Sequence, residues 1–263
     1  MLRGHICIVT LCRNSIRFPV ATAVIELIKG APLFEGLGEE ALMSLTQGSF
    51  VQRYPSNVAL FDEGETSPFV YVLLEGQIER FSTHRGRESG LGFIYPSAAF
   101  ILSCAITQTP NTFSARTLSN SRFVLVPAQN VRTLFGANLQ FARNVARDIA
   151  DCEQEVMAEL KNQKLRTMAE RLANWILLNV PGDAQGQWTR LPMSKQALAL
   201  YLGTTPENLW RSFVALEPHG VGVRRREVLV SDFGKLIEFA GPNPLIDRRP
   251  RQALAGPELA ATD

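Results

Sequence analysis

Residues 194–220 read SKQALALYLGTTPENLWRSFVALEPHG and carry the signals of two short helices joined by a tight turn. Ser194 is a suitable N-cap for the first helix, because its hydroxyl can accept a hydrogen bond from a free backbone N–H. Gly203 permits the turn. Thr205 can cap the second helix, and Pro206 then occupies its first position, where a missing N–H costs nothing.

The next stretch, GVGVRRREVLVSD at residues 220–232, alternates apolar and polar residues around three arginines. This pattern predicts a two-stranded hairpin with residues 224–226 at its tip. Two helices across a Gly-containing turn, followed by such a hairpin, are typical of a winged helix-turn-helix. In that motif the second helix enters the major groove of DNA.

Glu207 and Arg211 lie one turn apart on the second helix, opposite the apolar stripe of Leu209, Phe213 and Leu216. They can read base edges, or they can pair with each other as an ordinary i, i+4 ion pair. The winged motif favours base reading. The predicted DNA-contacting residues are Ser194, Lys195, Thr205, Glu207, Asn208, Trp210, Arg211, Arg224, Arg225 and Arg226.

The charge distribution supports a polyanionic partner for this part of the chain. Residues 164–250 hold 12 Lys or Arg against 8 Asp or Glu, whereas residues 1–163 hold 14 against 15. Trp210 leaves a second interpretation open. An exposed Trp is a typical anchor of protein–protein interfaces, so the helical pair could instead contact another protein.

Residues 129–164 contain no Pro and a single Gly, and their apolar residues recur at steps of three and four. This pattern predicts a long helix with a nearly heptad stripe. The helix could pack on its own domain, but its length favours pairing with a symmetry mate. We expect a dimerisation helix at residues 137–164, with an interface made of Val145, Ile149, Cys152, Val156 and Leu160.

Short β-rich segments separated by turn residues run from residue 51 to 127, which indicates an antiparallel barrel. Residues 23–50 show helical spacing. The expected fold class is α+β, with an effector-sensing barrel domain at residues 23–136 and a winged helix-turn-helix at 165–240. We expect residues 1–22 to be a poorly ordered extension, or an over-long gene start, and residues 241–263 to be a flexible tail.

This order of parts resembles the Crp/Fnr family of bacterial transcription regulators over about residues 25–240. The matching stretches are LFEGLGEEAL (33–42), VALFDEGETSPFVYVLLEGQIERF (58–81) and SKQALALYLGTTPENLWRSFVALEPHGV (194–221). The Glu and Arg of the family's recognition helix are present as Glu207 and Arg211. The resemblance implies a cytoplasmic homodimer that binds an inverted-repeat operator and contacts RNA polymerase.

The chain departs from the members of that family that bind cyclic AMP. Their Gly-Glu-Leu stretch, which binds the ribose, has no Glu equivalent near Leu102, and Asn111-Thr112 stands where an Arg-Ser pair binds the phosphate. Without that Arg the phosphate has no bidentate partner. Arg116 could substitute, although an outward-facing strand arginine is the simpler interpretation. The candidate effector pocket comprises Leu102, Asn111, Thr112 and Arg116, with cyclic AMP not expected as its ligand.

The sequence requires no cofactor. Four thiolates hold an iron–sulfur cluster, but Cys7, Cys12, Cys104 and Cys152 lack the oxygen-sensing relatives' spacing. Haem ligation would fall to His5, His84 or His219, each of which also suits a structural position. Either redox sensor remains an alternative of the same fold. No catalytic or metal-binding motif is present, and no apolar run is long enough to span a membrane.

Overall fold

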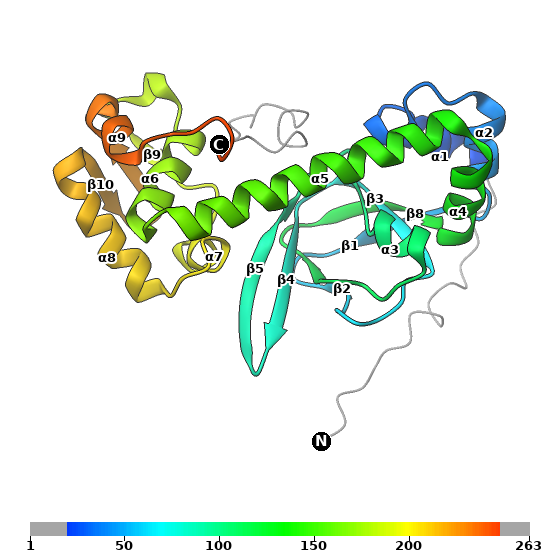
Figure 1. Cartoon of the computed structure of the whole chain (residues 1–263), viewed down its shortest axis with the longest axis horizontal. Helices are drawn as coiled ribbons and strands as arrows, with labels where there is room; N and C mark the ends of the chain where they lie inside the picture. Colours follow the sequence, from blue (N-terminus) through cyan, green and yellow to red (C-terminus); the bar gives the residue numbers. More distant parts are fainter. Residues whose placement is uncertain (1–19, 248–263) are drawn as a thin grey trace.

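The computed structural model describes residues 20–247 and the side chains from residue 22 onward, and it confirms the α+β class. Figure 1 shows two lobes joined by one long helix, α5. The N-terminal lobe begins with α1 (Val20–Ile28), a 3₁₀ turn η2 (Pro32–Phe34) and α2 (Glu39–Thr46), as the helical spacing predicted.

Two four-stranded antiparallel sheets form the predicted barrel, in the orders β1-β8-β3-β6 and β2-β7-β4-β5. Side chains on β3 alternate between two cores: Val70 and Val72 pack under the helices, whereas Tyr71 and Leu73 fill the barrel. This is the period-two alternation of a strand that is buried on both faces. The strands are β1 (Phe50–Tyr54), β2 (Ala59–Phe61), β3 (Phe69–Glu75), β4 (Ile78–His84), β5 (Arg87–Ile94), β6 (Ala99–Phe100), β7 (Ser114–Thr117) and β8 (Ser121–Pro127).

A short helix, α3 (Leu102–Thr107), interrupts the barrel between β6 and β7. The sequence pattern indicated only barrel strands here, with Leu102 in the effector pocket, and did not predict this helix. Both flanking residues have left-handed backbone conformations, Ile101 with φ 62° and Gln108 with φ 57°. A β-branched residue rarely adopts that conformation, so the surrounding structure must hold Ile101 in place.

The helix predicted at residues 129–164 is divided into α4 (Ala128–Ala137) and α5 (Leu139–Leu165). Asn138 has an extended backbone, and its side chain accepts a hydrogen bond from the Phe141 N–H at 2.9 Å. An Asn in this role caps a new helix. The break turns the chain, so α5 leaves the barrel and runs to the second lobe (Figure 1).

The C-terminal lobe contains the predicted helix-turn-helix, α7 (Lys195–Tyr201) and α8 (Pro206–Leu216), packed against α6 (Met168–Asn179). The wing has three strands rather than two, because β9 (Trp188–Arg190) pairs with β11 (Glu227–Val230), which pairs with β10 (Val221–Arg224). Two 3₁₀ turns, η3 (Gly182–Ala184) and η4 (Glu217–His219), complete the lobe together with α9 (Phe233–Ala240), which the sequence analysis missed.

The two lobes also touch away from α5. The ring of Phe93 on β5 stacks on Tyr201 at the end of α7, with centroids 4.9 Å apart and planes 12° apart. Burial is the main reason why the pKa of Tyr201 is raised to about 12. The first helix of the helix-turn-helix therefore rests against a strand of the barrel.

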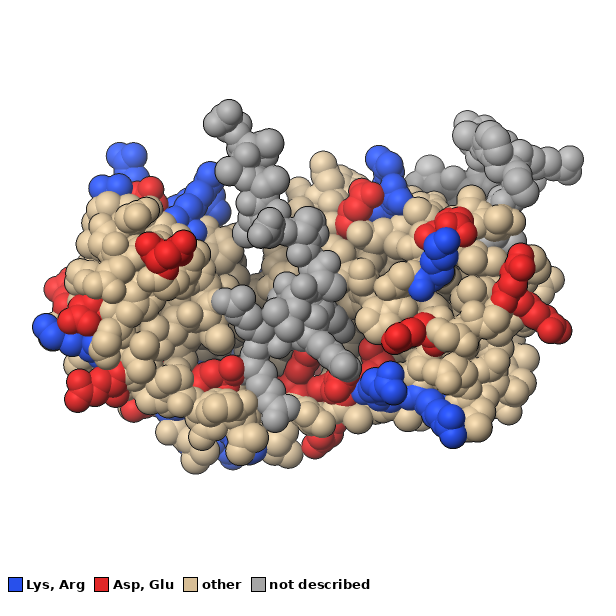
Figure 2. Space-filling view, turned by 90° about the horizontal axis from the view of Figure 1, so that it is seen from above, with Lys and Arg blue, Asp and Glu red and all other residues tan. Residues whose placement is uncertain are grey.

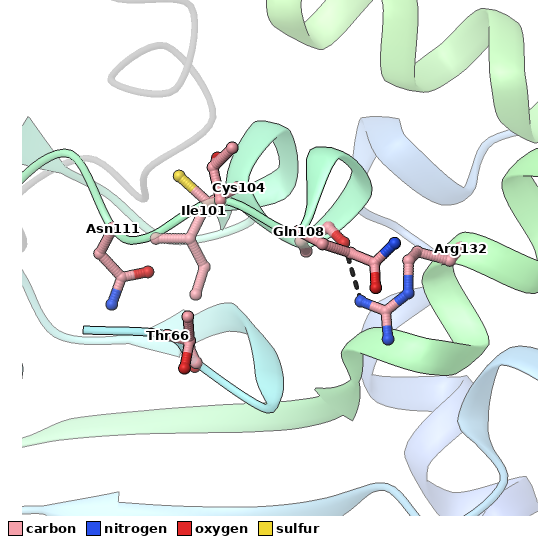
Figure 3. A pocket seen from close by; sticks show the side chains of 9 residues that line it. Thr66, Ile101, Cys104, Gln108, Asn111 and Arg132 are labelled. Atoms are coloured by element: carbon pink, nitrogen blue, oxygen red, sulfur yellow. Dashed lines mark hydrogen bonds between the residues drawn. The ribbon is translucent and has the colours of Figure 1, made fainter. Parts of the chain in front are cut away.

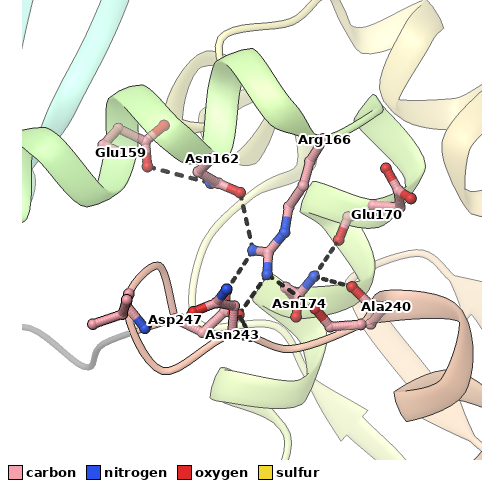
Figure 4. A network of polar contacts seen from close by, with 10 residues as sticks. Glu159, Asn162, Arg166, Glu170, Asn174, Ala240, Asn243 and Asp247 are labelled. Carbon is pink, nitrogen blue, oxygen red and sulfur yellow. Dashed lines mark hydrogen bonds and ion pairs between the residues drawn. The ribbon is translucent and has the colours of Figure 1, made fainter.

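Residues 241–263 were expected to form a flexible tail. The first seven of them, residues 241–247, instead fold back onto the junction between α5 and α6. Arg166 donates from both terminal nitrogens to the two carboxylate oxygens of Asp247, each at 2.6 Å (Figure 4). The side chains are 7 % and 11 % exposed. A bidentate pair with this little solvent access fixes the segment where α5 meets the second lobe.

We expect Asp247→Asn to lower the stability of the C-terminal lobe by about 1–2 kcal/mol, because hydrogen bonds to a charged acceptor contribute more than neutral ones. Thermal unfolding followed by tryptophan fluorescence measures the change, since Trp175, Trp188 and Trp210 all lie in that lobe. Asp183→Asn is the matched control, because Asp183 is exposed. Equal melting temperatures for the two variants would contradict a stabilising role for the pair.

Candidate nucleic-acid interface and effector pocket

Helix α8 presents a polar face to solvent because its start is fixed and its apolar stripe is buried. The Thr205 hydroxyl accepts a hydrogen bond from the Asn208 N–H at 3.3 Å, and Pro206 follows the cap as predicted. Leu209 and Phe213 are buried in the core of the lobe. In Figure 1 the helix lies along the outer edge of this lobe, away from the barrel.

Glu207 and Arg211 both lie on the exposed side of α8, and no ion pair among the described residues joins them. A hydrogen bond from the backbone N–H of Glu207, and then one from the Thr205 hydroxyl, lower the pKa of the Glu207 carboxyl. The Glu207 carboxylate therefore favours its charged form at the start of the helix. The charge of Arg211 also lowers this pKa, but the two side chains form no ion pair, so the Arg211 guanidinium can bind another partner.

Trp210 is 54 % exposed and has a neighbour within the lobe. The Lys195 ammonium at the start of α7 lies 5.7 Å from the centroid of the Trp210 ring and 5.8 Å from that of Phe213. At this distance a cation is attracted to the ring face. Ser194 caps α7 by accepting from the Ala197 N–H at 3.1 Å. The two helices thus present one continuous surface.

The three wing arginines are not equivalent. Arg224 donates from Nε to Glu227 at 2.7 Å, and its guanidinium lies 4.2 Å from the centroid of the Trp188 ring. Arg225 and Arg226 are exposed at the turn, and no ion pair of the described residues includes either one. Only these two side chains are therefore free cations at the wing tip.

The charges on another face of the molecule are mixed. Viewed from above, acidic and basic side chains are interspersed over both lobes, without one continuous basic field (Figure 2). Free cations of the DNA-binding kind are instead found on the exposed side of α8 and at the wing tip.

A cavity of about 660 Å³ lies between the barrel and α5. Leu102 lines it, together with barrel residues such as Phe100 and Phe113. From α5 it receives Asp148, Asp151, Cys152 and Glu155 among others, and from β4 it receives Arg80. Burial, followed by the charges of Asp151 and Glu155, raises the pKa of Asp148 to about 6. The α5 side of the cavity is therefore acidic.

Three of the four predicted effector residues lie elsewhere. Arg116 donates to Glu79 at 2.7 Å and to both oxygens of Glu88 at 2.8 and 3.2 Å, and it lies over the Phe81 ring. A guanidinium with two carboxylate partners cannot replace a phosphate-binding Arg, so that assignment is wrong. Asn111 lines a different, smaller cavity, and Thr112 is exposed.

The cysteines and histidines that the structure describes are dispersed. Cys104 is buried on α3, whereas Cys152 is exposed on α5. His84 is exposed next to the Arg85-Gly86 hairpin turn, and His219 packs against the Phe239 ring at 4.2 Å. Within residues 20–247 no three His, Cys, Asp or Glu side chains form a group suited to a metal ion. Cys7, Cys12 and His5 lie outside the described residues.

Comparisons with known proteins agree with both lobes. The family model of the cyclic nucleotide-binding domain matches residues 51–138, and that of the Crp-like helix-turn-helix domain matches residues 170–239. A CRP-like cAMP-activated global transcriptional regulator of Mycobacterium tuberculosis is 22 % identical over 233 residues, covering 82 % of this chain and 99 % of its own length.

The chain is also similar to a transcriptional activator and to solved structures. The transcriptional activator protein anr of Pseudomonas aeruginosa is 29 % identical over 192 residues, covering 69 % of this chain and 77 % of its own length. The crystal structure of a Crp/Fnr-family regulator from Eubacterium rectale aligns with a TM-score of 0.65 and 16 % identity, covering 80 % of this chain and 98 % of that structure.

A sensor-type barrel joined to a Crp-like helix-turn-helix defines a class of bacterial transcription regulators. The chain belongs to the Crp/Fnr family. Crp-like regulators of this kind bind DNA and typically dimerise, and the family is one of regulators rather than enzymes. No helix between residues 20 and 247 combines the length and the apolar character needed to cross a membrane.

Proposed function

We propose that the protein is a homodimeric regulator that binds an inverted-repeat DNA operator through α8 and the wing. The observation that carries this proposal is the outer face of α8, where Glu207 and Arg211 are both exposed and no ion pair of the described residues includes either one. Arg can bond the O6 and N7 of guanine, and Glu can accept from the amino group of cytosine. RNA polymerase is the expected protein partner, and the cytoplasm the expected location.

The proposed dimer interface is the exposed apolar face of α5. Ile149, Val156 and Leu160 are 40 %, 60 % and 44 % exposed, and Cys152 lies on the same side. Exposed apolar stripes of this kind mark protein interfaces. Val145 was predicted to lie in this interface, but it is fully buried in the core of its own barrel lobe and cannot contact a second protomer. The proposed dimer interface therefore starts at Ile149.

We assign a separate role to each of three segments of the chain. Residues 23–136 sense an effector, residues 137–164 dimerise, and residues 165–240 bind DNA, with residues 241–247 added to the last unit by the Arg166–Asp247 pair. The effector would occupy the cavity between the barrel and α5. It lies against the proposed dimer face, since Ile149, Val156 and Leu160 also line that cavity.

We expect no saturable heat when cyclic AMP is titrated to micromolar or low millimolar concentration in a calorimeter. Asn111 stands where cyclic AMP-binding relatives have the phosphate-binding Arg. The cavity is lined by four acidic side chains of α5, which outnumber Arg80 and Arg147 and so disfavour an anion: Asp148, Asp151, Glu153 and Glu155. The pH should be 7.5, well above the raised pKa of Asp148, so that this repulsion is present. A clear one-site isotherm would refute this expectation.

A salt titration of DNA binding tests the proposed function against a protein-contact role for α8. Neutralising phosphates releases counterions, so the affinity for DNA should fall steeply as salt rises. The second role is suggested by the half-exposed Trp210, although its ring already holds Lys195. DNA affinity that is weak and insensitive to salt would favour that role.

A further inference from the structure

A second, smaller cavity of about 280 Å³ lies on the barrel lobe, between α3, the loop that precedes β3, and α4. Figure 3 shows Asn111 at one end, and Gln108 with Arg132 at the other, with Thr66 and Ile101 between them. None of the side chains that line it is acidic, and Arg132 is the one charged residue among them. The cavity differs in charge from the acidic cavity beside α5.

Asn111 is the feature that points to a ligand. Its side chain is 3 % exposed, yet neither the amide nitrogen nor the amide oxygen has a hydrogen-bond partner in the structure. Buried polar groups in folded proteins are nearly always paired, so an unpaired amide facing a cavity requires an explanation. The backbone leaves it no freedom to move away, because Asn111 donates to the Glu65 carbonyl at 2.7 Å and accepts from the Gly64 N–H at 2.8 Å.

Arg132 supplies the opposite end with a cation that has only neutral partners. One terminal nitrogen donates to the Ala105 carbonyl at 2.9 Å and the other to the Gln129 side chain at 2.8 Å. No ion pair of the described residues includes Arg132. A guanidinium has five N–H groups, so these two bonds hold it in position and leave donors for an anion.

We propose that this cavity binds a small organic acid that carries a carboxylate and a hydroxyl or oxo group. The carboxylate would pair with Arg132, since carboxylates match the guanidinium geometry. The second polar group would bond the Asn111 amide, which can both donate and accept. Ile101, held with φ 62°, gives the middle of the ligand an apolar wall. A volume near 280 Å³ lies just below the range of about 300–1,000 Å³ for drug-sized ligands, which suits a small acid.

The site is separate from the proposed DNA interface and from the cavity beside α5, so it does not depend on the proposed function. Its test is calorimetry and thermal unfolding of the full chain with lactate, L-malate, 2-oxoglutarate and citrate, at matched ionic strength. At least one acid should give saturable heat and raise the melting temperature. Asn111→Leu and Arg132→Gln should each weaken binding of that acid by tenfold or more.

Two further variants keep the result interpretable. Asn144→Leu is the control for folding, because Asn144 is equally buried but donates to the Leu33 and Glu35 carbonyls. Without acid it should melt several degrees below the wild type, whereas Asn111→Leu should melt close to it. Asp148→Asn alters only the cavity beside α5 and should leave the affinity for the acid unchanged.

The proposal is overturned if none of the four acids binds at 10 mM, about the concentration at which a millimolar site is nearly filled. It is equally overturned if Asn111→Leu binds as tightly as the wild type, or if Asp148→Asn loses as much affinity as Asn111→Leu. In the last case the acid occupies the cavity beside α5.

Discussion

Replacing Ile149 by Asp is expected to leave the protein monomeric at micromolar concentration. Ile149 lies near the middle of α5, the helix that joins the two lobes, and its side chain is 40 % exposed in one protomer. In the proposed dimer this side chain is buried against its counterpart, so the variant would bury an unpaired carboxylate in each protomer. That costs about 3 kcal/mol or more per site. Analytical ultracentrifugation reports the mass directly.

Ala150→Asp is the matched control for this experiment. It adds the same charge to the same helix, but the next residue along an α-helix points about 100° away. Ala150 is exposed and lies off the apolar face. This variant should sediment as a dimer, like the wild type. A dimeric Ile149→Asp variant would contradict the assignment of the dimer interface to α5, whatever the control shows.

Replacing Arg211 by Ala is expected to weaken binding to the preferred DNA site by about 1–3 kcal/mol, or roughly 5- to 150-fold. The physical reason is the loss of a bidentate contact to guanine from a side chain that forms no ion pair with the described residues. Discrimination at one base pair of each half-site should also relax. Fluorescence anisotropy with the preferred site and with its single-base variants measures both effects.

Substitutions of the wing arginines provide the comparison with Arg211→Ala. Arg225→Ala should weaken binding to all sequences by a similar factor and reduce the salt slope by about one, because a phosphate contact carries no sequence information. Arg224→Ala should have a smaller effect on binding, since Arg224 is already engaged by Glu227 and Trp188. If Arg211→Ala weakens all sequences equally, Arg211 holds phosphate and does not read bases.

The helix-turn-helix could be predicted from the sequence because its signals are local. Ser194 and Thr205 act as caps, and Pro206 starts α8, as their positions indicated. Each of these preferences is decided within about four residues. The buried stripe of Leu209 and Phe213 also follows directly from helical spacing.

Other features depend on partners that are distant in sequence, so no local pattern predicts them. Arg116 pairs with Glu79 and Glu88 across neighbouring strands, so its role is set by the register of β4, β5 and β7. The heptad-like stripe of α5 does not reveal that Val145 still lies under the barrel lobe. Asp247 is fixed by Arg166, which is 81 residues away.

Helix α9, which was not predicted, does have a local sequence signal. Asp232 caps α9 by accepting from the Lys235 N–H at 3.0 Å, and an apolar helical pattern follows it. The unpaired amide of Asn111, unlike the cap of α9, has no local sequence signal. Its burial depends on where α3 and the loop before β3 meet, so no sequence pattern could have identified it.

Selection of binding sites from randomised DNA by the wild-type protein shows whether it binds DNA as a sequence-specific dimer. We expect an enriched inverted repeat with a G·C pair in each half-site. The half-site centres should lie about one helical turn apart, as two recognition helices of a symmetric dimer require. Enrichment of a single unpaired half-site would contradict the dimer. No enrichment above the starting pool would contradict sequence-specific DNA binding itself.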